Sequence, residues 1–280
     1  MKALNVKTDE FYKCHPIVNF IYFVFVIGLT MFFWHPVFLI LSFIASIFYL
    51  KLYRVNIHLP YMLCMMFFII LFNVLVNHQG TTILFYTFYG NPITLESLIY
   101  GVSASLMLAS VICWFSCYMK IITSDKFIYL FSKISKKLSM FFSMVLRFIP
   151  LLLRRLKEVY SVQKLMCYDK TSKLKLAINS FFITTSWAIE NAIVTSNSME
   201  SRGYGLDGRS SFCNYRFPVR DIVILLIMIF LFLGTIFGLQ SEDFYIRYFP
   251  SIEVNTSTLG VAFSSGLLFL PELINLYYKR

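Results

Sequence analysis

The chain of 280 residues has few charged residues. Asp, Glu, Lys and Arg make up 14% of it, where about 25% is usual in soluble domains. Hydrophobic residues make up 58%, against about 45–50% in soluble domains, and the mean hydropathy is +0.71. Such a chain has too few polar side chains to cover the surface of a soluble fold. The composition therefore predicts an integral membrane protein.

Several sequence motifs for disulfide, metal and nucleotide sites are also missing. The six cysteines form no C-x-x-C pair, and no G-x-x-x-x-G-K-[ST] sequence occurs, so we expect no disulfide framework, no metal site, no cofactor and no ATP site in this chain. The four histidines are widely spaced near predicted membrane boundaries, where polar-tipped rings are common. They are His15, His35, His58 and His78.

One sequence, Gly203–Gly208, matches the G-x-G-x-x-G pattern of dinucleotide-binding proteins. That pattern binds a pyrophosphate only between a strand and the start of a helix. Here it follows a predicted helix, which favours a helix end and a turn.

Six apolar runs are long enough, or nearly so, to cross a hydrocarbon core of about 30 Å. The first follows a basic N-terminus but leads directly into the second, so we expect it to be retained as a span. The six runs are Ile17–Phe33, Pro36–Leu50, Tyr61–Val76, Leu98–Met119, Ile222–Leu239 and Leu259–Tyr277. About six spans are predicted, although Leu174–Val194 is also apolar, so a count of five or seven stays open.

The positive charges predict the orientation of these spans. With the N-terminus inside, 24 of the 25 Lys and Arg residues fall on the inner side and only Arg247 falls outside. The loop from Asn77 to Ser97 has none. Positive residues concentrate on the cytoplasmic side of membrane proteins, so we interpret the net charge of +11 as a topology signal rather than a nucleic-acid site. Both termini are predicted to be cytoplasmic, in the cell membrane.

The spans carry no Asp, Glu, Lys or Arg near their centres, and Glu272 lies towards the inner end of the last one. Ionisable groups inside a bilayer usually mark an ion or proton pathway. Their scarcity argues against a proton-coupled transporter and places the expected functional chemistry in the cytoplasm.

Between the fourth and fifth spans lies a basic region that is too long for a turn. We therefore divide the chain into a membrane region 1–119, a cytoplasmic domain 120–220 and a second membrane region 221–280. The domain is expected to contain a helix starting at Ser124 and two long amphipathic helices. The apolar positions of the first are Phe127, Leu130, Phe131, Ile134 and Leu138; those of the second are Phe141, Met144, Val145, Phe148, Leu152, Leu156 and Val159, with Pro150 expected to kink it. The third helix is expected to end at Gly203. Its apolar positions are Leu174, Ile178, Phe181, Thr185, Ile189, Ala192 and Met199, and the membrane helices, the other long helix or a partner could cover them.

The sequence Ser198–Tyr204 at this helix end has two interpretations. Arg202 and Gly203 are suited to a helix C-terminus, where a cation complements the dipole and glycine adopts a left-handed conformation. A protruding end is equally suited to present the Arg202 guanidinium to a carboxylate of a partner protein. The local sequence leaves both open.

The sequence resembles the transmembrane T component of energy-coupling factor (ECF) importers of vitamins and metals, a family that includes cobalt-transport permeases. The resemblance extends over nearly the whole chain. Ser198–Tyr204 is similar to the family's second X-Arg-Gly signature, and Leu146–Pro150 to its Arg-Phe-Ile-Pro segment. Further similar positions are Cys14-His15-Pro16, Ile122-Thr123-Ser124, Arg209–Phe212 and Asp221.

The chain departs from this family at the first X-Arg-Gly motif, which ends the preceding long helix. After Val162-Gln163-Lys164 the chain has Leu165, Met166 and Cys167, so that both the arginine and the glycine are missing. We call these three residues the degenerate first motif. Lys164 or Lys170 could substitute for the missing cation, and the two docking ends are expected to differ.

The resemblance implies a non-catalytic scaffold. Its cytoplasmic helices would dock on two ABC-type ATPase subunits, through Glu200, Ser201, Arg202 and Gly203 at the second motif. Its membrane part would hold a separate substrate-binding S component. Two alternatives stay open: the membrane subunit of another ATP-driven transporter, and a membrane-embedded enzyme acting on lipids.

Overall fold

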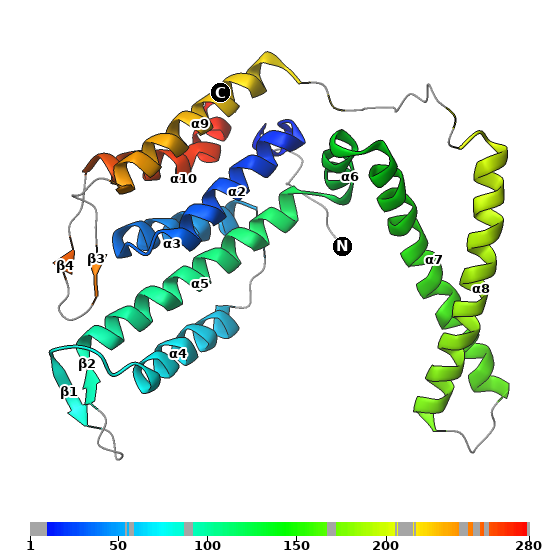
Figure 1. Cartoon of the computed structure of the whole chain (residues 1–280), viewed down its shortest axis with the longest axis horizontal. Coiled ribbons are helices and arrows are strands. Elements are labelled where there is room, and N and C mark those ends of the chain that lie inside the picture. The colour runs from blue at the N-terminus through cyan, green and yellow to red at the C-terminus, as the bar shows by residue number, and fades with distance from the viewer. Residues whose placement is uncertain are drawn as a thin grey trace. The chain divides into compact units, whose positions relative to one another are not determined.

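The structure is a computed structural model of the whole chain. It describes residues 10–53, 55, 59–86, 92–166, 172–204, 206, 215, 217–240, 246–248, 253–254 and 258–278. The chain forms two compact units (Figure 1). We call Met1–Lys126 with Tyr215–Arg280 the membrane unit and Phe127–Asn214 the hairpin unit. The hairpin unit lies inside the region 120–220, and the three-part division of the chain stays a prediction.

Every predicted apolar run coincides with a helix of the membrane unit. These helices are α2 (Pro16–Phe32), α3 (Pro36–Leu52), α4 (Leu59–Val76), α5 (Leu95–Ile121), α9 (Val219–Gln240) and α10 (Thr258–Tyr278). In the described part of the chain, α4, α5, α9 and α10 are long and apolar enough to cross a membrane. Helices α2 and α3 are apolar but have only 17 residues each. The protein is therefore mostly helical, with four candidate membrane-spanning helices.

The starts of these helices follow from local sequence. Pro16 and Pro36 occupy the first turns of α2 and α3, where proline lacks only an N–H that the helix would leave unpaired. Thr94 caps α5, and its hydroxyl accepts a hydrogen bond from the Ser97 N–H at 3.3 Å. A short helix α1 (Glu10–Lys13) precedes α2.

The structure also contains two short β-hairpins, which the all-α prediction did not include. Strand β1 (Ile83–Tyr86) pairs antiparallel with β2 (Pro92–Thr94) before α5. Strand β3 (Ile246–Arg247) pairs with β4 (Glu253–Val254) between α9 and α10. Both lie in connections between helices, so they do not alter the helical class of the fold.

Helix α5 is central to the membrane unit and packs against α2, α3 and α4, while α10 packs against α3 and α9. Aromatic rings fill the core between them. Trp114 on α5 has its ring centroid 5.2 Å from that of Tyr49 on α3 and 6.2 Å from that of Tyr22 on α2, and all three side chains are fully buried. The Trp114 indole N–H donates to the Ser42 hydroxyl at 3.0 Å, which satisfies both polar groups inside the core.

The hairpin unit consists of α6 (Ser124–Ile134, whose first residues belong to the membrane unit), α7 (Lys136–Met166) and α8 (Lys173–Ser201). The predicted start at Ser124 is confirmed. The first helix ends at Ile134, however, so Leu138 lies in α7. Ser135 separates the two helices: its carbonyl accepts the Ser139 N–H at 3.2 Å, and serine is a preferred N-cap residue. Pro150 lies inside α7.

Helices α7 and α8 run antiparallel and pack against one another over part of their lengths (Figure 1). Near one end the Ser180 hydroxyl donates to the Gln163 side-chain oxygen at 3.3 Å. Further along, Phe148 stacks on Trp187 with ring centroids 6.4 Å apart. Six of the seven predicted apolar positions of α7 are half-buried, and the seventh, Phe141, is 60% exposed.

The face of α8 that meets α7 differs from the predicted apolar face. Its most buried side chains are Leu176, Ser180 and Thr184, spaced four residues apart. The larger apolar side chains lie on other faces and are exposed: Leu174, Ile178, Phe181, Phe182, Ile189 and Ile193. Small residues such as Ser180 and Thr184 lie at this interface, and most of the predicted apolar positions of α8 are exposed and do not face α7.

Candidate functional site

The C-terminal end of α8 is closed by a pair of backbone hydrogen bonds. The Gly203 N–H donates to the Glu200 carbonyl at 2.9 Å, and the Tyr204 N–H to the Met199 carbonyl at 3.0 Å. Gly203 has φ of +80°, a conformation that a residue with a Cβ adopts only at a cost. This combination is a Schellman motif. The predicted helix stop at Gly203 is confirmed, and the first glycine of the G-x-G-x-x-G pattern therefore follows a helix.

The four predicted docking residues lie together at this end. Glu200, Ser201 and Arg202 are exposed and Gly203 is half-buried. The Ser201 hydroxyl donates to the Asn197 carbonyl at 2.8 Å, so its hydrogen is used within the helix. Within the described part of the chain, the charged groups of Glu200 and Arg202 make no hydrogen bond or ion pair. Both remain available to a partner.

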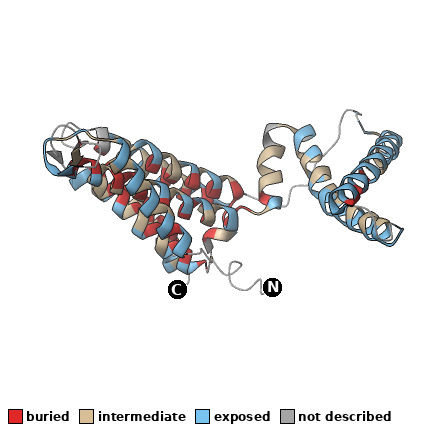
Figure 2. Cartoon of the chain, turned by 90° about the horizontal axis from the view of Figure 1, so that it is seen from below, coloured by how far each residue is buried: buried red, intermediate tan, exposed pale blue. Residues whose placement is uncertain are grey.

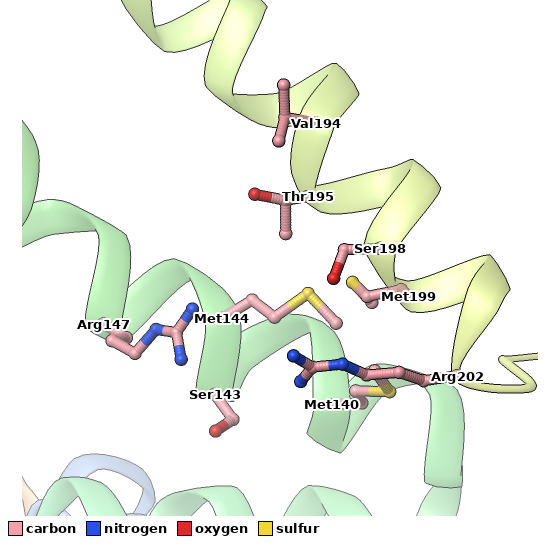
Figure 3. Close-up of a pocket in the computed structure, with 9 residues that line it drawn as sticks. All are labelled: Met140, Ser143, Met144, Arg147, Val194, Thr195, Ser198, Met199 and Arg202. Carbon is pink, nitrogen blue, oxygen red and sulfur yellow. The ribbon is translucent and has the colours of Figure 1, made fainter.

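Arg202 also lines a groove of about 530 Å³ between the end of α8 and the first half of α7. The groove has three methionines, two arginines and small polar residues along its walls (Figure 3). The lining residues are Met140, Ser143, Met144, Arg147, Val194, Thr195, Ser198, Met199 and Arg202. In Figure 3 the side chains of Arg147 and Arg202 extend toward one another from α7 and α8, and the Ser198 hydroxyl points into the space between the helices.

Arg147 was not among the predicted docking residues, although it belongs to the segment Leu146–Pro150 that resembles the family. It is exposed, and no described residue makes an ion pair or hydrogen bond with it. Its position beside Arg202 follows from the antiparallel register of α7 and α8. Helical periodicity places Arg147 on a face of α7, but it does not reveal which residue of α8 lies opposite.

The degenerate first motif lies at the opposite end of the helix pair. Leu165 and Met166 are the last residues of α7 and are 82% and 78% exposed. Cys167 and Lys170 lie outside the described residues. Lys164 is exposed near the helix end. Because α7 and α8 are antiparallel, their C-terminal ends are separated by about the length of α8, roughly 40 Å at 1.5 Å per residue.

Further residues of the resemblance meet in the membrane unit. The backbone N–H of His15 donates to the Asp221 carboxylate at 2.7 Å, and the Arg220 guanidinium lies 3.3 Å from the same carboxylate. The Lys126 ammonium donates to the Tyr12 carbonyl and lies 3.9 Å from the centroid of the Tyr12 ring. These contacts join the segment before α2 to the starts of α6 and α9.

Burial shifts the pKa of two groups in this cluster, Cys14 and Lys126. Desolvation raises the pKa of the Cys14 thiol to about 11 and lowers the pKa of the Lys126 ammonium to about 8. Cys14 is therefore a protonated thiol at neutral pH, and a thiol in that state is a poor nucleophile. The arrangement is typical of a structural tie between chain segments rather than a reactive centre.

No group of three or more His, Cys, Asp or Glu that could hold a metal ion occurs among the described residues. Neither a protein-family model nor a curated protein matches the sequence.

Proposed function

We propose that this protein is the transmembrane coupling subunit of an ATP-driven, ECF-type importer of vitamins or trace metals. It would connect two cytoplasmic ABC-type ATPase subunits to a membrane-embedded S component that binds the substrate. In this function the chain is a scaffold and the partners hydrolyse ATP. Two properties support the proposal: a helical unit with apolar candidate spans, and a pair of long, basic helices whose C-terminal residues are exposed.

In the proposed topology the protein crosses the cell membrane with six spans. Both termini and the hairpin unit lie in the cytoplasm. The 17 residues of α2 and of α3 lie at the lower limit for a span, about 17–25 residues. The distribution of 24 of 25 positive residues supports the orientation. Single cysteines placed in Asn77–Ser97 should react with an impermeant thiol reagent added outside. Cysteines placed in α7 should react only after permeabilisation, and labelling of α7 from outside would contradict the topology.

The observation that carries the proposal is the end of α8. The Schellman motif turns the chain sharply after Arg202, and the guanidinium remains exposed without a partner among the described residues. A helix-terminal cation stabilises its own helix by only about 0.3–1 kcal/mol. Pairing with a partner's carboxylate would account for an arginine at this position better than helix capping alone.

Replacing Arg202 tests this directly. Loss of one member of a hydrogen-bonded interfacial charge pair typically costs about 2–5 kcal/mol, and each 1.4 kcal/mol is about tenfold in affinity. Arg202→Ala should therefore reduce ATPase copurification by more than about tenfold and abolish most uptake, at unchanged membrane abundance. Arg202→Lys should restore part of both, because lysine keeps the charge but lacks the planar fork.

Arg154→Ala is the matched control, since Arg154 is an exposed arginine of α7 outside the groove. It should behave as the wild type. Normal uptake by Arg202→Ala would leave that residue with a capping role only. The companions of the tagged wild-type chain separate the alternatives. ATPases with a small membrane binder support the proposal, ATPases alone indicate another ATP-driven transporter, and neither indicates an enzyme.

A further inference from the structure

The groove between α7 and α8 brings two arginines into one binding surface. Arg147 and Arg202 come from different helices and point toward one another (Figure 3). Neither makes an ion pair or hydrogen bond to the described residues, so nothing in this part of the chain neutralises the groove. A groove with guanidinium groups on both of its walls favours an anionic occupant, and the planar fork of arginine suits a carboxylate in particular.

The excess of positive charge in the hairpin unit also favours an anionic occupant. Its described part contains eleven Lys and Arg residues but only three acidic ones, Glu158, Glu190 and Glu200. Glu158 is already paired with Arg155, with the two groups 3.3 Å apart. An acidic partner would be attracted over the whole unit and held between the two arginines.

The remaining lining favours a protein segment over a small anion. Met140, Met144 and Met199 provide a flexible apolar wall, and methionine is over-represented on surfaces that accept the side chains of another protein. The Ser198 hydroxyl makes no hydrogen bond to the described residues and faces the groove. Apolar, hydroxyl and cationic groups together match a peptide segment that has a large apolar side chain next to a carboxylate.

We infer that the α7–α8 groove binds an acidic segment of one ATPase subunit, and that Arg147 and Arg202 grip the same carboxylate. The inference rests on the proposed function for the identity of the partner. It extends the docking site from the tip of α8 to the side of α7. It also makes the two ends of the helix pair unequal, because the opposite end offers the exposed Leu165 and Met166.

The test uses the full chain in mild detergent with the ATPase subunits that copurify with the wild type. ATPase retention is measured for Arg147→Ala, Arg202→Ala and the double variant, with Arg154→Ala as the control. Each single groove variant should lose at least about tenfold in retention. The retention of the double variant should be within about threefold of that of the single variant with the lower retention, because the effects of groups that share one partner are not additive. Arg147→Lys should recover part of the loss.

A second variant addresses the apolar wall. Met144→Glu places a carboxylate in the groove, where it can occupy the arginines, and should lower ATPase retention about as much as the double variant. Met144→Leu keeps the volume and the apolar character and should lose much less retention than Met144→Glu. Equal loss of ATPase retention in both variants would indicate a packing defect and would contradict the inference. The thermal midpoint of each purified variant shows whether its fold is intact.

The outcomes separate this inference from the proposed function. Wild-type retention in Arg147→Ala, with loss in Arg202→Ala, would confine docking to the helix tip and overturn the groove while leaving the proposed function in place. No loss in either variant would remove both. Loss in Arg154→Ala of the same size would show that net charge alone acts. An equal loss in Asp207→Asn would assign the groove to this chain's own following segment and overturn the inference.

Discussion

The two units of the molecule differ in how many large side chains they bury. In the membrane unit, large side chains such as Tyr22, Tyr49 and Trp114 are fully buried and contact one another. In the described part of the hairpin unit, Leu176 is the only buried hydrophobic residue, at 8% exposed. Figure 2 shows this difference as red positions through the first unit and mostly pale blue helices in the second.

The difference separates what maintains the fold from what is available for contact. A close-packed core provides most of the stability of a folded unit, so the membrane unit contains the interactions that hold its own helices in place. The described part of the hairpin unit has almost no such core, and its large apolar residues, including Phe181, Phe182 and Ile189, are exposed. Exposed apolar surface of this extent marks contact with a protein or a membrane. Substitutions in the first unit should therefore reduce folding, and those in the second should reduce assembly.

The largest expected effect on stability is that of Trp114→Ala in the membrane unit. The change removes the ring that contacts Tyr22 and Tyr49 and leaves the buried Ser42 hydroxyl without its donor. Replacing a buried aromatic residue by alanine costs about 3–5 kcal/mol. Membrane abundance and the thermal midpoint in detergent should both fall.

Phe148→Ala in the hairpin unit is the matched change. Phe148 stacks on Trp187 but is only half-buried, so the loss should be about 1–2 kcal/mol, less than the value for a fully buried side chain. An equal fall in thermal midpoint for the two variants would break the comparison, because it would show that the hairpin unit depends on a core as much as the membrane unit does.

A smaller effect than that of Trp114→Ala is expected where α9 and α10 pack together. A Cβ on Gly238 would lie 2.6 Å from the Gly260 Cα, and a backbone atom cannot move aside as a flexible side chain can. Overpacking of this kind costs about 1–3 kcal/mol, so Gly238→Ala should lower the thermal midpoint. Gly28→Ala on α2 is the control, since a Cβ there meets nothing within 4 Å. It should be neutral or stabilising by about 0.5–1 kcal/mol, and a loss in both would point to a general intolerance of alanine.

The sequence predicted the helices of both units well, and the reason is local. Apolar runs determine where α2, α3, α4, α5, α9 and α10 lie, and Gly203 ends α8 because the left-handed turn requires glycine. The extra helix boundary at Ser135 was missed because apolar spacing continues on both sides of it. The two β-hairpins were missed because strands of two to four residues are too short to show an alternating pattern.

The candidate site was only half predictable for a different reason. Arg202 is recognisable from its neighbours in the sequence, since it stands beside Gly203 at the end of a helix. Arg147 becomes part of the site only through the register of α7 against α8, which depends on small residues such as Ser180 and Thr184. The tie of His15 to Asp221 likewise joins residues that are far apart in the chain. Long-range pairing is set by packing, which a single sequence does not display.

The smallest expected effect on membrane abundance, and the sharpest test of the comparison, is that of Gly203→Ala. Alanine at φ of +80° is strained by about 1–2 kcal/mol, and its Cβ would lie 3.0 Å from the Leu206 Cδ1, the flexible end of a side chain that can move. The strain falls on the end of α8 rather than on a core, so Gly203→Ala should leave membrane abundance unchanged. It should still lower ATPase retention by about five- to tenfold, because each 1.4 kcal/mol is about tenfold and the chain would leave Arg202 in a different direction. Gly203→Asn should be milder, since asparagine tolerates the left-handed region better than alanine does. Retention and abundance are measured together in the same membranes. If abundance falls as steeply as retention, the end of α8 contributes to folding, and the division between a folding unit and a contact unit fails at the residue where it predicts the clearest separation.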